Sequence, residues 1–575
     1  MTRKIVILFF VLNLFLLQPI FFPNLADLNA WDEAAYVNSG RELLDRGNLP
    51  DFAGNPLMSL FYALTYLPFH NSPFWLVQSD SLGRIFLFAL LWLSAYLVAK
   101  EVSRFFSPAL PTDLLMVGMI LVTPLAAQML RFPSDPMFAS LAGLSLWQLL
   151  AYHRTSLVKH LWLASVFIGL AALARNDGLV AWAVLLVLVI LLGIQSKSWR
   201  IAGRAVVATI IPFALFIGGY VLFYGIRTGH FELGTAERTY INFEVGQQAI
   251  FSGTGQLDLT TEARLEARRS FGTPEENNYS VFKAIQRNPR VYLQRLVATV
   301  KALPENLLRA YGIRFAPILF LLALRGLIEL VRQKRYTLLV LLCLWAAPLL
   351  TGFIITLFRS GHLLLPFYVL FVLASIGLIA LLRGLGNRRE AYAWLAVLLA
   401  LVIYGLVGNK LAIYYSAAVL LAALAIIYIL IKPTPTATNG LAVSLLILLS
   451  AGLILRGELP SPKIRTFNQT PDEQSAVYLA NLLEPGTLVA AGTPAPVWMA
   501  KMEFANIIAP DVPIHDTPSE FLDWLRIQDI RAVYVDQSLY STNPGLWALL
   551  EAEIGSGLEQ VHTNDNGNIQ ILLVR

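Results

Sequence analysis

The sequence predicts an α-helical polytopic membrane protein with about 13 transmembrane helices and a small C-terminal extracytoplasmic α/β domain. Three observations predict this class. Hydrophobic residues make up 57% of the 575 residues and charged residues only 14%, whereas soluble domains carry about 25% charged residues. Many apolar segments approach the roughly 20 residues that a membrane-spanning helix needs. Basic residues recur in every second connection between these segments, as expected of cytoplasmic loops.

The composition also excludes several other classes of protein. The net charge of +6 is modest, and no segment interleaves dense Lys and Arg with aromatic residues, so the charge indicates membrane orientation and not nucleic-acid binding. The single cysteine, Cys343, lies within an apolar segment, which excludes a disulfide framework and a cysteine-based metal site. No G-x-G-x-x-G or G-K-[ST] motif opens a βαβ unit, so the signature of a soluble nucleotide-binding domain is missing.

The expected spans follow one another closely along the chain. The first follows Arg3 and Lys4, as in a signal peptide, but its apolar segment is long and no small-residue cleavage site follows. We therefore expect an uncleaved signal anchor. The expected spans are 4–22, 82–100, 113–131, 136–152, 160–175, 178–195, 204–224, 313–331, 336–357, 363–382, 391–409, 411–431 and 441–456.

The basic connections fix the expected orientation, with the N-terminus in the cytoplasm and the C-terminal domain outside the cell membrane. Three long segments then lie outside the cytoplasm. They are the outer loops 23–81 and 225–312 of a transmembrane domain, 1–456, and the soluble domain 457–575. The basic connections contain Arg3/Lys4, Lys100/Arg104, Arg154/Lys159, Lys197/Arg200/Arg204, Arg332/Lys334/Arg335, Arg383/Arg388/Arg389 and Lys432.

The outer segments contain recognisable elements. In the first, a helix over 29–46 should end at Gly47, before the apolar stretch 56–69. The second ends in a basic amphipathic stretch, 288–308, which suits the membrane surface. In the C-terminal domain we expect helices and strands in alternation. The helices are expected at 471–483, 518–527 and 545–553, the strands at 487–491, 531–535 and 569–574, and a hairpin turn at 565–567.

Ionisable residues gather where the expected spans end on the outer side. Because ionisable groups at membrane depth are costly and tend to mark functional sites, their convergence on one face predicts a pocket of carboxylates and cations. The residues are Asp32 and Glu33 after the first span, Arg131 and Asp135, Arg175 and Asp177, and Arg359 and His362.

Each of these pairs also has a purely structural explanation. The first two acids would favour the dipole in the first turn of a helix capped by Asn29. Asp135 would be a turn residue and helix cap in its Pro-Ser-Asp-Pro setting. Arg175 and Asp177 would neutralise each other in a tight loop, and the last pair would anchor a helix at the interface.

A pocket of this kind suits group transfer from a phosphate ester. A carboxylate accepts a proton from an attacking hydroxyl, while Arg and His hold the charge that grows on a leaving phosphate. Since phosphate is a good leaving group, one general base suffices. A lipid-linked sugar phosphate would place its phosphate at the bilayer boundary, where these residues are expected.

Three short motifs resemble the GT-C class of polytopic glycosyltransferases, which includes protein O-mannosyltransferases and the lipid A aminoarabinose transferase. The likeness covers about residues 1–380 in order and topology. The opening of the first outer loop in that class, D-E-x-x-Y…L-L…G, is similar to Trp31-Asp32-Glu33-Ala34-Ala35-Tyr36, followed by Gly40-Arg41-Glu42-Leu43-Leu44 and Gly47. The end of its long middle loop is similar to 288–293, and its R-Y-x-L-P segment to His362-Leu363-Leu364-Leu365-Pro366.

The resemblance implies an inverting transfer of a hexosyl or pentosyl group from a polyprenyl-phosphate sugar to an extracytoplasmic acceptor hydroxyl on a lipid, glycan or protein. It implies that Asp32 is the catalytic general base and Asp135 the second acid. We expect Glu33 to have a supporting role next to the donor phosphate or the acceptor. His362 stands where the class has an Arg-Tyr pair, so the phosphate contact falls to Arg359 or to another cation. The other candidates for substrate binding are Arg131, Arg175 and Asp177.

Two further questions stay open at this point. Carboxylates at positions 32, 33 and 135 would be possible oxygen ligands for a divalent metal, although we expect neither a metal nor another cofactor. The rival functions are a polysaccharide polymerase or ligase of another family, and a membrane transporter. Transporters tend to carry polar groups at mid-membrane and to have repeated halves, whereas here the charges lie at helix ends and 225–312 has no counterpart.

The C-terminal domain is expected to recognise or position an acceptor without supplying the catalytic carboxylate. Its acids Asp511, Asp516 and Asp536 lie where helix caps and strand ends are expected, and no close His/Ser arrangement is expected there.

Overall fold

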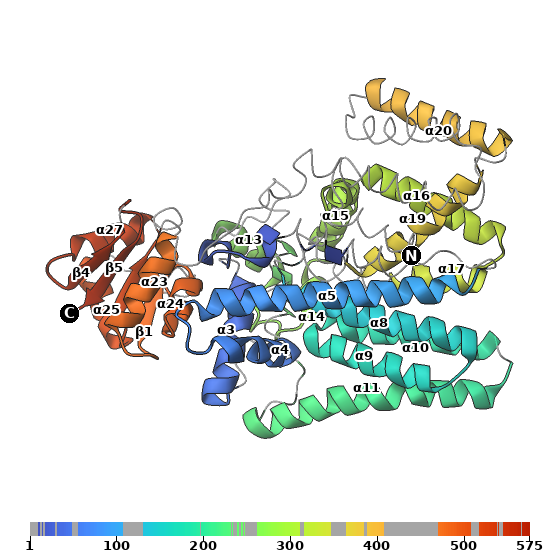
Figure 1. Cartoon of the computed structure of the whole chain (residues 1–575). Helices are drawn as coiled ribbons and strands as arrows, with labels where there is room; N and C mark the ends of the chain where they lie inside the picture. The colour runs from blue at the N-terminus through green and yellow to red at the C-terminus, as the bar shows by residue number, and fades with distance from the viewer. Residues whose placement is uncertain are drawn as a thin grey trace. The chain divides into compact units, whose positions relative to one another are not determined.

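The fold is described from a computed structural model of the whole chain (Figure 1). The chain divides into two compact units, which are described separately. Unit 1 consists of Met1–Leu17 and Leu87–Pro462, and unit 2 of Gln18–Phe86 and Lys463–Arg575. The structure describes residues 10–11, 14, 18–28, 31–48, 56–106, 130, 132–195, 197–229, 231, 233, 239–240, 243–244, 246–247, 261–310, 316–346, 364–384, 388–407, 470–507, 517–536, 539, 544–564 and 566–575.

Unit 1 is helical throughout its described residues. Helices α8 to α11 lie side by side, with α9 packed against α8, α10 and α11 (Figure 1). The bounds are α5 Trp75–Ser103 (of which the part up to Phe86 belongs to unit 2), α8 Ser134–Thr155, α9 Lys159–Ala174, α10 Asp177–Gln195, α11 Trp199–Thr228, α13 Thr261–Phe271, α14 Val281–Arg287, α15 Pro289–Ala310, α16 Ala316–Arg332, α17 Tyr336–Trp345, α19 Leu364–Gly384 and α20 Arg388–Val407.

Several of these helices have the length and composition of membrane spans. Among the described residues, three helices are long and apolar enough to cross a membrane, namely Trp75–Ser103, Asp177–Gln195 and Trp199–Arg227. Leu215 on α11 and Val187 on α10 are more than half exposed. Exposure of large apolar side chains is unfavourable in water and favourable against lipid.

Each expected span that the structure describes coincides with a helix, although the bounds of the helix and of the expected span differ. Helices α8, α9, α10 and α11 contain or nearly contain the spans expected between 136 and 224, and α16, α19 and α20 match three of the later ones. Helix α17 covers the first part of 336–357, and residues 347–357 lie outside the described residues. The segment 4–22 is described in part. The expected spans 113–131, 411–431 and 441–456 lie outside the described residues except for Leu130, so the number of spans stays a prediction.

The start of α5 differs from the expectation. The second span was expected to begin at residue 82, but α5 begins at Trp75. Its first turns carry Gln78, Ser79 and Asp80, which hydropathy assigns to a loop. Ser79 and Asp80 are fully buried against other parts of unit 2, and this packing keeps a polar segment helical. The loop 23–81 therefore ends inside a helix.

Helices α16 and α19 cross at two glycines. A Cβ atom on Gly326 would overlap the main-chain carbonyl oxygen of Leu373, and one on Gly377 would overlap that of Leu322. Glycine lets two helix backbones approach closely, which is how helices without a hydrophobic driving force pack in lipid. The crossing therefore depends on both positions lacking a side chain.

Unit 2 combines the first outer segment with the C-terminal part. The sheet has the order β2-β1-β3-β5-β4, in which β1 is parallel to β2 and β3, and β5 is antiparallel to β3 and β4. The elements are α2 Gln18–Phe21, η1 Leu25–Leu28, α3 Trp31–Arg46, α4 Pro56–Tyr66, η2 Leu67–Phe69, α23 Pro471–Leu482, β1 Leu488–Ala491, α24 Pro494–Met499, β2 Glu503–Asn506, α25 Pro518–Ile527, β3 Ala532–Val535, α27 Pro544–Ala552, β4 Leu558–Thr563 and β5 Gln570–Val574.

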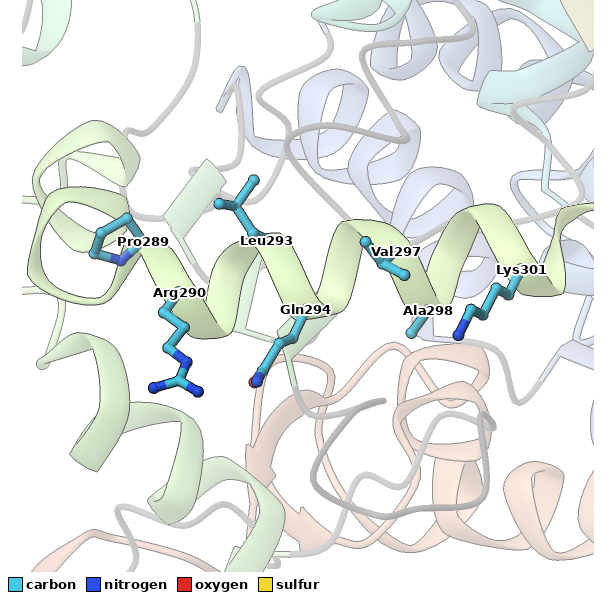
Figure 2. A pocket seen from close by; sticks show the side chains of 7 residues that line it. All are labelled: Pro289, Arg290, Leu293, Gln294, Val297, Ala298 and Lys301. Atoms are coloured by element: carbon cyan, nitrogen blue, oxygen red, sulfur yellow. The ribbon is translucent and has the colours of Figure 1, made fainter.

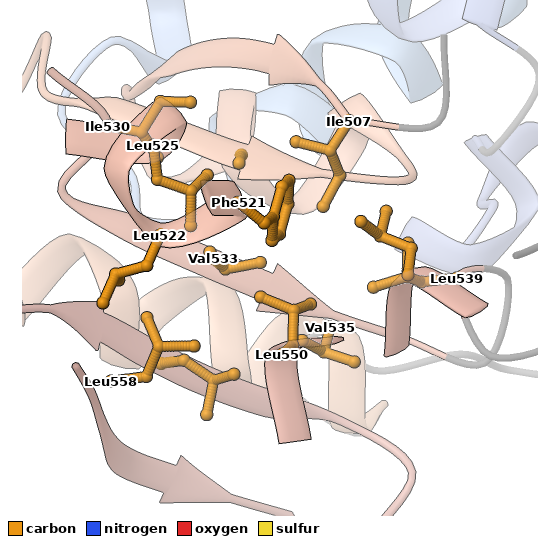
Figure 3. Packing of buried hydrophobic residues seen from close by; sticks show 13 residues of the cluster. Ile507, Phe521, Leu522, Leu525, Ile530, Val533, Val535, Leu539, Leu550 and Leu558 are labelled. Carbon is orange, nitrogen blue, oxygen red and sulfur yellow. The ribbon is translucent and has the colours of Figure 1, made fainter. Parts of the chain in front are cut away.

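Helices cover both faces of this sheet because β3 presents apolar side chains to each face in alternation. Val533 and Val535 face one hydrophobic cluster with Phe521 of α25 and Leu550 of α27 (Figure 3). Ala532 and Tyr534 face the opposite cluster, which contains residues of α23 and α24. Successive side chains of a strand point to opposite faces, so a fully apolar strand of this kind belongs in the middle of a sheet.

The expected helices and strands of the C-terminal part are confirmed to within one residue at each end by α23, α25, α27, β1, β3 and β5. The hairpin is also confirmed, since β4 and β5 pair antiparallel and the Gly567 N–H donates to the Asn564 carbonyl oxygen at 2.9 Å. Residue 565 lies outside the described residues. Three short elements were missed: α24, β2 and β4. Their four to six residues include too many polar or small side chains to give a periodic signal.

Candidate functional site

Helix α3 carries the first pair of expected site residues. It ends as expected at Gly47, which has a φ of +67° and donates its N–H to the Leu43 carbonyl oxygen at 3.1 Å. Its middle lies close to α4, because a Cβ on Gly40 would overlap the main chain of Tyr62 and Ala63. Asp32 lies in the first turn of this helix, and the placement of its side chain is outside the described structure.

The neighbouring acid, Glu33, lies in a buried charge network. The Arg84 guanidinium contacts a Glu33 carboxylate oxygen at 3.3 Å and an Asp80 carboxylate oxygen at 2.6 Å. Arg84 also donates to the Ile20 carbonyl oxygen at 2.7 Å, and the Tyr62 hydroxyl donates to Asp80 at 3.1 Å. The side chains of the three charged residues are at most 2% exposed.

This network changes the interpretation of Glu33. A buried carboxylate needs a charged or hydrogen-bonding partner, and Arg84 supplies one from α5. Glu33 therefore fixes the first turn of α3 from inside the protein. The supporting role expected for Glu33 next to the donor phosphate or the acceptor stays a prediction.

A second charge cluster lies at the ends of three helices in unit 1. The Arg175 guanidinium contacts Asp135 in the first turn of α8 and Asp177 in the first turn of α10, at 2.7 Å. It also lies 6.0 Å from the centre of the Phe138 ring. The loop that carries Arg175 is tight, because Gly178 approaches the α9 backbone so closely that a Cβ there would overlap Ala172.

The structure thus brings together three of the expected site residues, Asp135, Arg175 and Asp177. The Arg175 side chain is 21% exposed, so the cluster is accessible as well as paired. Either acid also lies at a helix N-terminus, where a negative charge is favourable. The expected residues Arg131, Arg359 and His362 lie outside the described residues.

Sequence reasoning missed Asp80 and Arg84. Both lie on α5, where the i, i+4 spacing of an acid and an arginine places them on one helix face. The signal was present in the sequence, but the expected span began at 82 and divided the pair between a loop and a helix. Burying an ion pair within an apolar helix costs free energy, so such a pair tends to mark a functional position.

The described residues do not form a metal site. Among them, no group of three or more His, Cys, Asp and Glu side chains could hold an ion. The carboxylates of Glu33, Asp80 and Asp135 each contact an arginine, and a guanidinium occupies the oxygen atoms that a divalent cation would need.

The C-terminal part lies against α3 within unit 2. Helix α24 packs on α3, and the Arg46 guanidinium contacts the Glu503 carboxylate at 2.9 Å. The Lys501 ammonium donates to the His70 carbonyl oxygen at 2.8 Å. These contacts give the C-terminal part a direct role in holding the helix that carries Asp32.

The expectation of no close His/Ser arrangement in the C-terminal part was wrong. The Ser475 hydroxyl lies 3.1 Å from His562 Nε2, and the Tyr478 ring stacks on the imidazole. Ser475 is fully buried, so its hydroxyl cannot meet a substrate. Asp536 is a capping residue as expected, since it accepts the Leu539 N–H at 3.0 Å, while Asp511 and Asp516 lie outside the described residues.

Comparison with known proteins identifies the fold. No protein-family model and no curated protein matches the sequence. Among solved structures, a similar fold covers nearly the whole chain. The chain is similar to ArnT from Cupriavidus metallidurans bound to undecaprenyl phosphate, with 14% identity, a TM-score of 0.56, and 98% of this chain and 97% of that chain covered.

Two further structures are similar. ArnT in the apo state gives 13% identity and a TM-score of 0.55 over 98% of this chain and 97% of that chain. The archaeal oligosaccharyltransferase AglB from Archaeoglobus fulgidus, in complex with an inhibitory peptide and a dolichol-phosphate, gives 12% identity and a TM-score of 0.49 over 99% and 74%. Of these three structures, the two of ArnT exceed a TM-score of 0.5, and they show a shared fold.

Proposed function

We propose that this protein is a membrane glycosyltransferase that moves a hexosyl or pentosyl group from a polyprenyl-phosphate donor to an extracytoplasmic acceptor hydroxyl on a lipid, glycan or protein. The observation that carries the proposal is the acidic first turn of α3, with Glu33 held by a buried arginine on a scaffold that has the fold of ArnT. The ArnT structure contains undecaprenyl phosphate, and a lipid-phosphate sugar is the donor that such a scaffold suits.

The proposed chemistry is a single inverting displacement. The acceptor oxygen attacks the anomeric carbon, Asp32 takes the hydroxyl proton, and the bond from the anomeric carbon to the phosphate oxygen breaks. The electron pair of that bond leaves with the polyprenyl phosphate. Because the leaving group is already an anion of low basicity, the reaction needs cations near the phosphate more than it needs a second acid.

Arg175 is the described cation to which we assign that task. It is partly exposed and already oriented by Asp135 and Asp177, and a guanidinium retains further donors for a phosphate oxygen. Asp135 then acts as the second acid of the site by holding Arg175. Arg131, Arg359 and His362 are the further proposed phosphate contacts.

The proposed setting follows from the basic connections. The N-terminus lies in the cytoplasm, and α3 and the C-terminal part lie outside the plasma membrane, in the cell envelope. The partners are a lipid-linked sugar donor, the membrane and an acceptor, with no nucleic acid and no cofactor. In this arrangement the C-terminal part recognises or positions the acceptor.

Turnover by purified protein in nanodiscs tests the proposal, with a panel of radiolabelled polyprenyl-phosphate sugars. Asp32→Asn keeps the shape of the side chain but cannot accept a proton, so turnover should fall about 10²–10⁴-fold while donor binding persists. Asp523→Asn, a change at an exposed acid of α25, is the control and should leave turnover unchanged.

Three results would reject the proposal. Near-normal turnover in Asp32→Asn, with only a lower melting temperature, would make Asp32 a helix cap. Movement of an intact sugar lipid across the bilayer without a covalent product would indicate a transporter. Elongation of a glycan on its own lipid carrier would instead indicate a polymerase.

A further inference from the structure

Helix α15, Pro289–Ala310, presents an unusual outward face. Its residues Arg290, Leu293, Gln294, Val297 and Lys301 lie along one side of the helix and line a shallow groove, together with Pro289 and Ala298 (Figure 2). Side chains three, four, seven and eleven positions apart share one face of an α-helix. This outward face is therefore continuous over about three turns.

The opposite side of α15 is fixed to the rest of its segment. Tyr292 and Arg295 are 7% and 2% exposed, and Tyr292 packs in a hydrophobic cluster with Tyr240, Phe243 and Phe271. Because this inward side is anchored, the helix cannot rotate to hide its outward side. The outward face is a fixed surface of the segment.

The outward face divides into an apolar stripe and a basic stripe. Leu293, Val297 and Val300 are 58%, 54% and 58% exposed. At about 100° per residue they lie on one side of the face, and Arg290 and Lys301 lie beside them. Neither cation has an ion pair with a described residue. Half-exposed aliphatic residues next to basic residues are typical of a helix that lies in a membrane interface.

The position of α15 in the chain agrees with this interpretation. Residues 311–315 alone separate it from α16, and a stretch of that length reaches at most about 20 Å. Helix α16 is an expected membrane span, so the C-terminal end of α15 lies near the bilayer boundary. On the preceding helix α14, the aromatic ring of Phe282 is 68% exposed, and aromatic side chains favour that boundary.

We propose that α15 lies in the outer membrane interface and binds the headgroups of anionic phospholipids. Leu293, Val297 and Val300 enter the region between the headgroups and the acyl chains. Arg290 and Lys301, about 16 Å apart along the helix axis, each contact the phosphate of a separate lipid. The site is distinct from the proposed catalytic residues, and it makes the protein selective for a membrane of negative surface charge.

Site-directed spin labelling of the full chain tests the depth of α15. In a Cys343→Ser background, single cysteines replace Leu293 or Val297 and carry a nitroxide, with the protein in vesicles of phosphatidylcholine and phosphatidylglycerol. At both positions we expect oxygen, which partitions into lipid, to relax the label more than a water-soluble nickel chelate does. Asp523→Cys, on an exposed residue of α25, should show the opposite order.

Lipid selectivity tests the basic stripe. Spin-labelled phosphatidylglycerol should associate with the parent protein several-fold more strongly than spin-labelled phosphatidylcholine. The Arg290→Gln/Lys301→Gln variant should lose most of that preference. The matched control, Arg269→Gln/Lys283→Gln, removes two exposed charges from the same segment and should keep it.

The outcomes separate the possibilities. Labels that are relaxed mainly by the nickel chelate would place α15 in water, and labels shielded from both reagents would place it against a protein partner. Either result overturns the proposal, and so does an unchanged lipid preference in the Arg290→Gln/Lys301→Gln variant. If the double variant is no longer monodisperse, Arg290→Gln and Lys301→Gln are tested singly, and each should lose part of the preference. Arg290→Lys, which keeps the charge, should keep it, and single variants that both keep the full preference would also overturn the proposal.

Discussion

The indole Nε1 of Trp75 donates a hydrogen bond to the main-chain carbonyl oxygen of Met499 at 3.0 Å and so joins two residues that are 424 positions apart. Trp75 begins α5 and is fully buried, with the Tyr66 ring edge-on at 5.1 Å and the Arg41 guanidinium over its face. Met499 ends α24, the helix that packs on α3. One side chain therefore connects the first outer segment to the C-terminal part.

Trp75→Phe should destabilise the protein by at least about 1–3 kcal/mol, because a buried carbonyl oxygen loses its donor and the smaller phenyl ring leaves part of the indole site empty. Thermal unfolding in detergent, followed by intrinsic fluorescence, measures this as a lower melting temperature. Trp162→Phe, at a tryptophan that is 41% exposed, is the control. Equal melting temperatures for the two variants would contradict the importance of the bond.

Arg84→Met should destabilise the protein by about 3–5 kcal/mol, since it removes the cation that contacts two buried carboxylates. The triple variant Glu33→Gln/Asp80→Asn/Arg84→Met removes the charges together and should recover most of the loss. The fraction of protein that stays monodisperse after heating measures both the loss of stability in Arg84→Met and its recovery in the triple variant. Arg269→Met removes an arginine whose ion pair with Glu266 is exposed on both sides and should cost less than about 1 kcal/mol. If the triple variant were no more stable than Arg84→Met, the three side chains would not act as one charge network.

Gly326→Ala should separate α16 from α19 and lower the melting temperature, because its methyl group has no space beside the Leu373 carbonyl oxygen. Overpacking of this kind costs about 1–3 kcal/mol. Gly218→Ala is the matched control within α11, where a Cβ meets nothing within 4 Å. That change should be neutral or stabilising by up to about 1 kcal/mol. Similar responses at both positions would show that the helices can adjust.

Asp472→Asn should stabilise the protein at neutral pH. Burial, together with the charge of Asp536, raises the pKa of Asp472, so the folded state holds the proton more tightly than the unfolded chain does. The stability that Asp472 contributes is complete below the pKa of an ordinary aspartate, about 3.9, and is lost as the pH rises through the raised pKa.

Melting temperatures measured from pH 4 to pH 8 check this prediction. The advantage of the Asp472→Asn variant over the parent should grow with pH and then level off. The Tyr534 hydroxyl, which donates to Asp472 at 3.3 Å, can donate to the asparagine oxygen instead. Asp523→Asn should follow the parent at every pH. Parallel curves for Asp472→Asn and the parent would mean that the carboxylate titrates normally in the fold.

Much of the fold follows from periodicity and length. The apolar segments that became α8 to α11 are long and uniform, and the strand that became β3 is apolar at every position, so hydrophobicity alone identifies them. The start of α5 was misplaced because tertiary packing, and not hydropathy, keeps Asp80 in a helix. The pairing of residues 18–86 with 463–575 has no local signal at all, since it depends on contacts such as Trp75 with Met499.

The candidate site was predictable in part. Asp135, Arg175 and Asp177 were expected on one face, and they do meet, because the helix ends that carry them are close in the fold. The burial of Glu33 was not predictable, since its partner Arg84 lies on a helix whose register the sequence left open. Composition can indicate that a charged residue lies near a membrane, but only the folded structure shows which residue it pairs with.

The discontinuity of unit 2 has a consequence for how the protein is made. Trp75 leaves the ribosome 424 residues before Met499, and at about 5–20 residues per second that interval lasts roughly 20–85 s. Throughout that time the nascent chain must keep the surface around Trp75 from aggregating while later helices enter the membrane. The final strands then complete a unit begun at the start of synthesis. A ribosome that stops early therefore releases a chain whose first outer segment lacks the C-terminal part that packs on it.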